Sequence, residues 1–71
     1  MDKNDFVQWH KRLGFASQSE GAAALGVKRS TYANYMGGIS RTTGKPVDYD
    51  LRLAYACAAI EAGIKPLGYQ D

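Results

Sequence analysis

Apolar residues recur along this chain at helical spacing, in segments that glycine or proline separates. Phe6, Trp9 and Leu13 follow one another at intervals of three and four residues, which places them on one side of a helix. Asn4 or Asp5 can cap this helix, and the glycine directly after Leu13 would end it. The pattern therefore predicts a first helix that ends at about Leu13 and buries its aromatic residues in a core.

Two short helices separated by a tight turn are predicted next. Ser17 and Glu20 form a capping-box pattern at the start of a helix that runs from Gln18 to about Leu25. Gly26 can adopt the positive φ that reverses the chain after this helix. We therefore expect the following helix to begin within a few residues of Gly26.

A glycine in the middle of the first of these two helices raises a question about packing. Gly21 costs about 1 kcal/mol relative to alanine in a helix interior. Either a neighbour packs closely against Gly21 or the cost is simply tolerated, and the sequence leaves both explanations open.

The helix after the turn has one apolar and one polar side. It begins at Lys28 or Ser30 and runs to about Met36, before two consecutive glycines. Tyr32 and Tyr35 lie three residues apart and define the buried side. The residues on the opposite side are Arg29, Ser30, Ala33 and Asn34. We therefore predict that this second group faces away from the core.

A final helix with two apolar sides follows a loop. The segment from Ile39 to Val47 is rich in serine, threonine, glycine and proline, which is typical of a loop. Asp48 can cap a helix that extends over about 48–62. One apolar stripe of this helix contains Leu51, Tyr55, Ala58 and Ala62, and the other contains Leu53, Cys57, Ile60 and Ile64.

These two apolar stripes exceed what one short chain can cover. A chain of 71 residues forms one domain, over 1–71, whose small core gains stability from association. We therefore expect one stripe to pack on the first three helices and the other to meet a second copy of the chain. The alternative is that the tail folds back over the second stripe. The residues that we assign to the subunit interface are Leu53, Cys57, Ile60, Ile64, Leu67 and Tyr69.

The acidic and basic residues are unevenly distributed. The net charge is only +2, but the segment from Gly21 to Val47 contains no aspartate or glutamate. The basic residues of this segment are Lys28, Arg29, Arg41 and Lys45. A cationic region in a nearly neutral chain is the charge pattern expected of a surface that binds phosphate groups.

The composition argues against catalysis, metal binding and membrane insertion. His10 and Cys57 are the single histidine and cysteine, too few for a disulfide framework or a metal site. A dyad of these two residues has no third group to orient it, so we expect no enzyme and no cofactor. The sequence carries no signal-peptide pattern and no apolar run of membrane-spanning length, and the expected location is the cytoplasm.

The region 18–38 resembles the helix-turn-helix of the lambda repressor and Cro regulators, the XRE-like family. The matching positions are Gln18, Ala22, Gly26, Val27, Thr31, Tyr32, Tyr35 and Gly38. The resemblance extends over about residues 4–62. It implies a compact all-α domain of four to five helices, in which the final helix serves the core and dimerisation. Tyr32 stands where the family usually has valine or isoleucine, which requires a wider core or a partner for the hydroxyl.

The resemblance also implies which residues would meet DNA. The side chains expected at base edges are Arg29, Ser30, Ala33 and Asn34. An arginine fork fits guanine, and an asparagine amide fits the N6/N7 edge of adenine. The residues expected along the DNA backbone are Ser17, Gln18, Ser19, Lys28, Thr31, Tyr35, Arg41, Thr42, Thr43 and Lys45. Three alternatives stay open: a phosphate contact for Arg29, a backbone cap for Asn34, and minor-groove entry for Arg41.

The expected function is sequence-specific binding of double-stranded DNA by a transcriptional regulator. The loop and long final helix also resemble, more loosely, short phage and mobile-element regulators, including the anti-CRISPR-associated autorepressors. We therefore expect a homodimer that binds an inverted-repeat operator and needs no small-molecule effector. The rival hypotheses are an antitoxin or other protein-binding module on the same fold, and an RNA-binding regulator.

Overall fold

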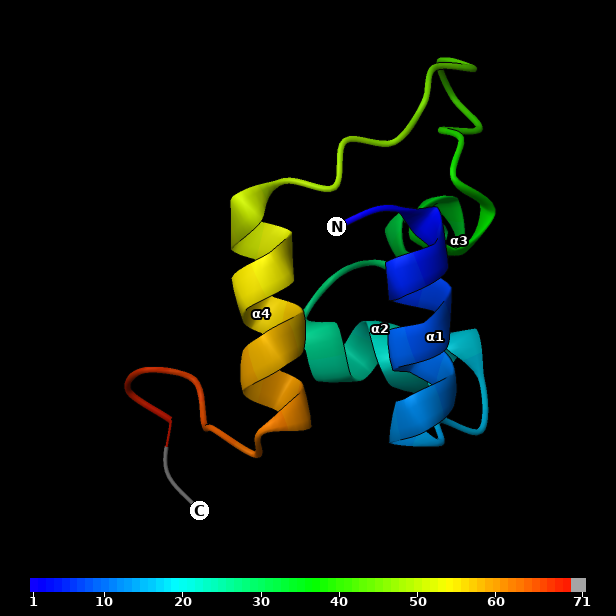
Figure 1. Ribbon diagram of the computed structural model, residues 1–71. Coiled ribbons are helices and arrows are strands. Elements are labelled where there is room, and N and C mark those ends of the chain that lie inside the picture. The colour runs from blue at the N-terminus through cyan, green and yellow to red at the C-terminus, as the bar shows by residue number, and fades with distance from the viewer. Residues whose placement is uncertain (70–71) are drawn as a thin grey trace.

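The computed structural model describes residues 1–69 of the chain. These residues contain four helices, which two short turns and one long loop connect. The helices are α1 (Lys3–Leu13), α2 (Gln18–Leu25), α3 (Arg29–Gly37) and α4 (Leu51–Glu61). In Figure 1, α2 passes between α1 and α4, and α3 is viewed nearly along its axis beside the start of α1. α3 packs against α1 and α2, and α4 packs on the same two helices. The predicted all-α fold class is therefore confirmed.

The first helix begins earlier than the sequence pattern predicted. Asp2 is the cap, in place of Asn4 or Asp5. One carboxylate oxygen of Asp2 accepts a hydrogen bond from the backbone N–H of Asp5 at 2.9 Å. The carboxylate of Asp5 accepts one from the N–H of Asp2 at 3.0 Å. Two aspartates thus form a reciprocal capping box, and each satisfies a donor that the first turn leaves without a helical partner.

The predicted boundaries of α2 are confirmed, and α3 begins at Arg29, between the two predicted starts. The predicted start of α4 is wrong. Ser17 caps α2 by accepting a hydrogen bond from the N–H of Glu20 at 3.1 Å. Gly26 ends α2 with a φ of +77°, in the left-handed region that glycine adopts without strain. Asp50, rather than Asp48, caps α4 through the N–H of Leu53 at 2.9 Å. The loop between α3 and α4 is accordingly longer than expected.

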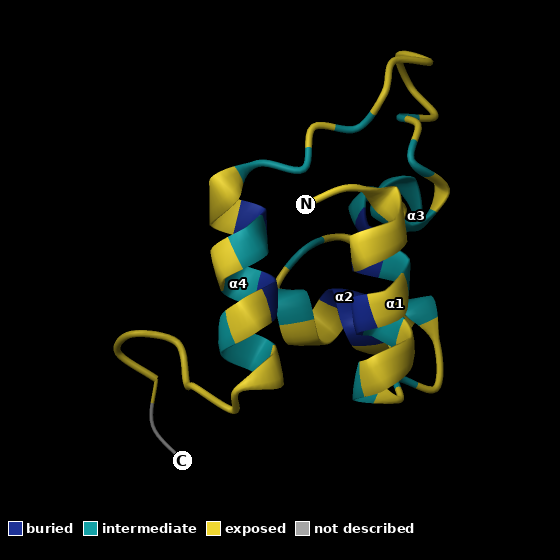
Figure 2. Ribbon diagram, in the orientation of Figure 1, coloured by how far each residue is buried: buried dark blue, intermediate teal, exposed yellow. Residues whose placement is uncertain are grey.

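Aromatic side chains from α1 and α3 form the centre of the core. Figure 2 marks the buried positions on the helix ribbons in dark blue. Phe6 is fully buried, and its ring centroid lies 5.3 Å from that of Trp9 and 5.2 Å from that of Tyr32. The indole N–H of Trp9 donates a hydrogen bond of 2.9 Å to the backbone carbonyl of Cys57, which ties α1 to α4. The buried hydrophobic residues are Phe6, Trp9, Ala22, Tyr32, Leu53 and Cys57.

Gly21 and the ring of Tyr32 pack directly against each other. A Cβ at Gly21 would overlap the hydroxyl and Cζ of Tyr32 and would lie 2.9 Å from its Cε1. The tyrosine ring therefore occupies the space above a glycine of α2, and its hydroxyl continues to Nδ1 of His10 on α1 at 2.7 Å. Burial raises the pKa of Tyr32 to about 12, so this hydroxyl stays protonated. Close packing, rather than tolerance, is the reason for the glycine.

The structure corrects part of the predicted subunit interface. Leu53 and Cys57 are only 8% and 4% exposed, because this stripe of α4 packs on α1 and α2. The opposite stripe faces solvent, with Leu51 67% exposed and Tyr55 69% exposed. Both Leu53 and Cys57 are therefore core residues and were wrongly assigned to a contact between subunits. Burial also raises the pKa of the Cys57 thiol to about 11.

The remaining residues of that predicted interface are placed differently. Ile60 is partly buried against the core, and it lines an apolar hollow together with Ile64. Ile64, Leu67 and Tyr69 follow α4 and are exposed. Up to Tyr69, the tail leaves Leu51 and Tyr55 exposed, which keeps an apolar surface open on α4 and on the segment that follows it.

Candidate nucleic-acid interface

The outer side of α3 presents the residues that the sequence placed there. Arg29 and Ser30 are exposed in its first turn, and Ala33 and Asn34 are partly exposed one turn later. Tyr32, on the opposite side, anchors the helix by complete burial. α3 is thus fixed to the core along one side and open along the other.

Two of the tyrosines keep α3 and the segment before α4 together. The hydroxyl of Tyr49 donates a hydrogen bond of 2.6 Å to the backbone carbonyl of Tyr35, and the two ring centroids are 6.2 Å apart. Burial raises the pKa of both side chains. Tyr35 also packs on Phe6, with ring centroids 5.3 Å apart. Its place is therefore in an aromatic cluster, although the sequence suggested a contact with the DNA backbone as well.

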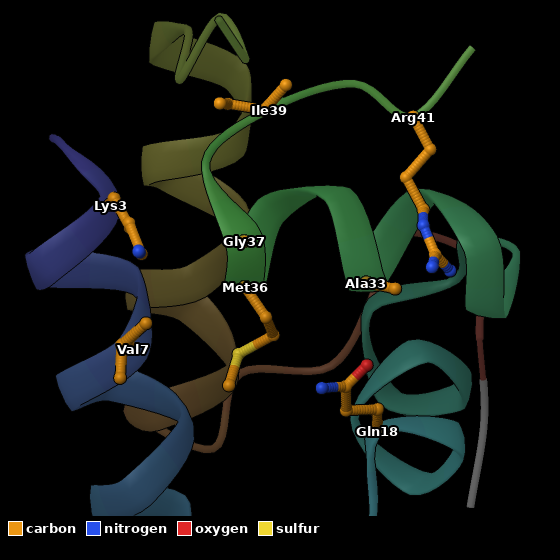
Figure 3. Close-up of a pocket in the computed structure, with 8 residues that line it drawn as sticks. All are labelled: Lys3, Val7, Gln18, Ala33, Met36, Gly37, Ile39 and Arg41. Atoms are coloured by element: carbon orange, nitrogen blue, oxygen red, sulfur yellow. The ribbon is translucent and has the colours of Figure 1, made fainter. Parts of the chain in front are cut away.

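An open groove of about 610 Å³ runs along α3 (Figure 3). Three helices and the following loop line it, through Lys3, Val7, Gln18, Ala33, Met36, Gly37, Ile39 and Arg41. Figure 3 shows the side chain of Arg41 running from the loop back toward α3, and the amide of Gln18 pointing toward Ala33. The groove therefore brings together predicted residues from α2, α3 and the loop.

Lys3 is a basic residue of this groove that sequence reasoning missed. Its side chain lies close to Gly38, where a Cβ would come within 3.0 Å of the lysine Cδ. Lys3 and Val7 are four residues apart and therefore share a side of α1. That spacing was available in the sequence, but the docking of α1 beside the end of α3 was not. Lys3 therefore adds one cation from α1 to the groove.

The loop after α3 is a braced hairpin. Ile39 and Pro46 form an isolated antiparallel bridge, and the N–H of Ser40 donates to the carbonyl of Lys45 at 2.9 Å. The N–H of Gly44 donates to the carbonyl of Ser40 at 2.7 Å, and that of Val47 to Gly38 at 3.0 Å. The exposed residues at the hairpin tip are Arg41, Thr42, Thr43, Gly44 and Lys45. Two cations and two hydroxyls are thus held on an ordered turn.

Asn34 connects α3 to this hairpin. Its side-chain oxygen accepts a hydrogen bond from the backbone N–H of Arg41 at 3.3 Å. This is the backbone-binding role that the sequence left as the alternative to a base contact. The hydrogen bond makes Asn34 part of the support of the hairpin.

The remaining predicted contacts lie near the N-termini of α2 and α3. Ser17 uses its hydroxyl oxygen as the cap of α2, while Ser19 is exposed and Gln18 is partly buried at the groove. Lys28 precedes α3 and is exposed, and Thr31 is partly exposed. The free N–H groups and positive dipole end of a helix N-terminus favour an anion, which suits a phosphate beside α2.

The ion pairs of residues 1–69 leave the groove side cationic. Arg12 donates two hydrogen bonds to Glu61, of 2.8 and 2.9 Å, which lower the pKa of the glutamate and raise that of the arginine. The second ion pair joins Arg52 to Asp50 at 3.5 Å. Both pairs involve residues of α4 or its cap, so within the described part they neutralise no charge on Lys28, Arg29 or Arg41.

Comparison of the chain with family models, with curated proteins and with solved structures finds no match. Within residues 1–69, no three histidine, cysteine, aspartate or glutamate side chains are grouped so that they could hold a metal ion. Across the same residues, no helix has the length and apolar character needed to cross a membrane.

Proposed function

We propose that this protein is a transcriptional regulator that binds a specific sequence of double-stranded DNA, with α2 and α3 acting as a helix-turn-helix. The observation that carries the proposal is the open side of α3, a helix fixed to the core by Tyr32 along its other side. The major groove of DNA is wide enough to admit a helix, and it displays a distinct donor and acceptor pattern for each base pair. Arg29 and Ser30 lie in the first turn of α3, the part that reads bases in such motifs.

The cations around α3 support this proposal. Lys3 and the N-terminus of α2 border the groove, while Lys28 precedes α3 and Lys45 lies on the hairpin. Contacts from such groups to phosphates supply most of the affinity of a DNA-binding protein and release counterions. We therefore expect binding to weaken steeply as the salt concentration rises.

A single α3 contacts too few base pairs to select one site, so we propose that the protein acts as a homodimer. The exposed apolar residues available for association are Leu51, Tyr55, Ile64, Leu67 and Tyr69. Two-fold symmetry would place two copies of α3 about 34 Å apart, on an operator with an inverted repeat. From the resemblance to short phage and mobile-element regulators, we further propose a cytoplasmic repressor of its own operon. An inverted repeat upstream of its gene is the site to test first.

The experiment is a selection of bound duplexes from a random pool, followed by titration of the selected duplex over a range of salt concentrations. We expect one enriched inverted repeat and a dependence of log K on log salt with a slope of several units. Arg29→Ala should weaken the selected duplex about 5- to 150-fold and relax one base pair. Lys45→Ala should weaken all duplexes alike and reduce the slope by about one unit. Absence of enrichment together with a flat salt response would contradict the proposal.

The exposed stripe of α4 favours one second candidate, a protein-binding module such as an antitoxin. Leu51 and Tyr55 lie on the side of the domain that the core does not use. Binding of duplex DNA that is weak, insensitive to sequence and nearly independent of salt would favour this candidate over the regulator. A preference for folded or single-stranded RNA in the same titration would favour the RNA-binding alternative.

A further inference from the structure

We infer that Arg41 reads a base pair from the hairpin and that Asn34 is the residue that positions it. The inference rests on the proposed function and deepens it. It changes the source of the base contacts, because the sequence assigned Asn34 to a base edge, with a backbone cap as the alternative, and Arg41 to the DNA backbone, with minor-groove entry as the alternative. Three observations support it: the hydrogen bonding of Asn34, the bracing of the hairpin, and the direction of the Arg41 side chain.

The oxygen of Asn34 already uses one of its two lone pairs within the protein. To read adenine, an asparagine must accept a hydrogen bond from N6 through its oxygen and donate one to N7 through its amide nitrogen. In this structure the oxygen accepts from the backbone N–H of Arg41 at 3.3 Å. The orientation of the amide is therefore set by the hairpin. Loss of this acceptor would leave the N–H of Arg41 without its partner and would release the start of the turn.

The hairpin holds the backbone of Arg41 in place. The bridge between Ile39 and Pro46 closes its base, and hydrogen bonds from Ser40 to Lys45 and from Gly44 to Ser40 brace the turn. The hydroxyl of Thr43 also accepts from the N–H of Lys45 at 3.3 Å. A base contact needs a side chain whose backbone is held in place, because immobilising a free loop on binding costs conformational entropy. Arg41 meets this requirement.

The direction of Arg41 favours a base over a phosphate. Its side chain runs back toward the open side of α3, and it lines the groove together with Gln18 and Ala33 (Figure 3). Ala33 carries only a methyl group, so a base edge can approach the helix at this point. A guanidinium offers a fork that matches O6 and N7 of guanine, and this is the commonest specific contact in the major groove. The expected target is therefore a guanine on the side of the half-site nearest Ala33.

The experiment measures discrimination, defined as the ratio of the affinities for the selected duplex and for duplexes that carry one changed base pair. Wild type, Arg41→Lys, Asn34→Ala and the double variant are compared at one salt concentration. Lysine keeps the charge but has no fork, so Arg41→Lys should lose about 5- to 150-fold discrimination at one guanine. Affinity for random DNA and the salt slope should stay unchanged. Asn34→Ala should reduce discrimination at the same base pair, and the double variant should be no worse than Arg41→Lys.

Each outcome has a distinct meaning. Arg41→Lys with full discrimination would make Arg41 a phosphate ligand and would overturn the inference while the proposed function stands. Loss of discrimination at an adenine in Asn34→Ala, independent of Arg41, would restore Asn34 as a base-reading residue and would also overturn it. Wild-type protein that shows no preference at any base pair would overturn the proposed function itself, and the inference with it. Lys45→Gln serves as the matched control, because it removes a hairpin cation that does not line the groove. It should weaken all duplexes alike and leave the discrimination between them unchanged.

Discussion

Replacement of Gly21 by alanine tests whether the tyrosine in the core determines the sequence of α2. In an ordinary helix interior this change stabilises by about 1 kcal/mol, because alanine loses less backbone entropy. Here the added Cβ would overlap the Tyr32 hydroxyl and Cζ. The ring has no free space into which to move, since Tyr32 is fully buried and its hydroxyl is hydrogen bonded to His10. We therefore expect Gly21→Ala to destabilise the protein.

The expected change in the free energy of unfolding is the sum of two losses and one gain. Forcing extra atoms into a well-packed core costs about 1–3 kcal/mol, and a displaced hydroxyl loses a hydrogen bond worth about 1 kcal/mol. Subtraction of the gain in helix propensity leaves a net loss of about 2 kcal/mol. In a domain of this size each kcal/mol lowers the Tm by roughly 4–8 °C, so a fall of roughly 8–16 °C is expected.

A double-mutant cycle identifies the cause. Leucine at position 32 lacks the ring atoms that a Cβ on Gly21 would meet, so Gly21→Ala should become stabilising, by about 1 kcal/mol, in a Tyr32→Leu background. Tyr32→Phe is the matched control, because it removes the hydroxyl but keeps Cζ and should relieve only part of the overlap. Urea denaturation of the variants gives the coupling energy. An equal destabilisation by Gly21→Ala in the tyrosine and leucine backgrounds would refute the reasoning.

Three further predictions concern α4. Trp9→Phe leaves the buried carbonyl of Cys57 without its indole donor and should cost about 1–3 kcal/mol in urea denaturation; a change below 0.5 kcal/mol, roughly the level of a surface substitution, would contradict it. The pKa of Glu61 is lowered in the folded state, so its pairing with Arg12 stabilises above the unfolded pKa and is lost as pH falls through the folded value. The Tm difference between wild type and Glu61→Gln should therefore shrink on acidification, whereas a constant difference would exclude the pair as its source. The raised pKa and burial of Cys57 predict that a thiol reagent modifies it at pH 8 only on unfolding, and rapid reaction of the native protein would disprove this.

Local chemistry made α2 and the turn after it predictable. The cap at Ser17 and the positive φ at Gly26 depend on residues within one turn of the chain, so the sequence pattern contains the information that they need. The starts of α1 and α4 were harder to predict for the same physical reason. The observed caps, Asp2 and Asp50, each lie two residues from a residue that the pattern favoured. Both have an extended backbone, which depends on how the chain enters the helix.

The buried side of α4 could not be derived from its own sequence. Both stripes are apolar, and the choice between them depends on how α4 docks on α1 and α2. The hydrogen bond from Trp9 to the carbonyl of Cys57 is part of this docking. The spacing of apolar residues along the chain does not predict it. The same limit applies to the groove, where Lys3 reaches the end of α3 only because α1 packs there.

The two sides of α3 have different roles. On the inner side, Tyr32 fills the core and requires a glycine at position 21. On the outer side, the small side chain of Ala33 leaves space in the groove. The guanidinium group that lines the groove with it belongs to Arg41 on the hairpin. Substitutions at Tyr32 should therefore change the free energy of unfolding without changing which base pair is preferred. Substitutions at Arg41 should do the reverse, because the hairpin carries none of the buried core residues. A variant of Tyr32 that folds but selects a different base pair would show that the inner side also sets the position of α3 on DNA.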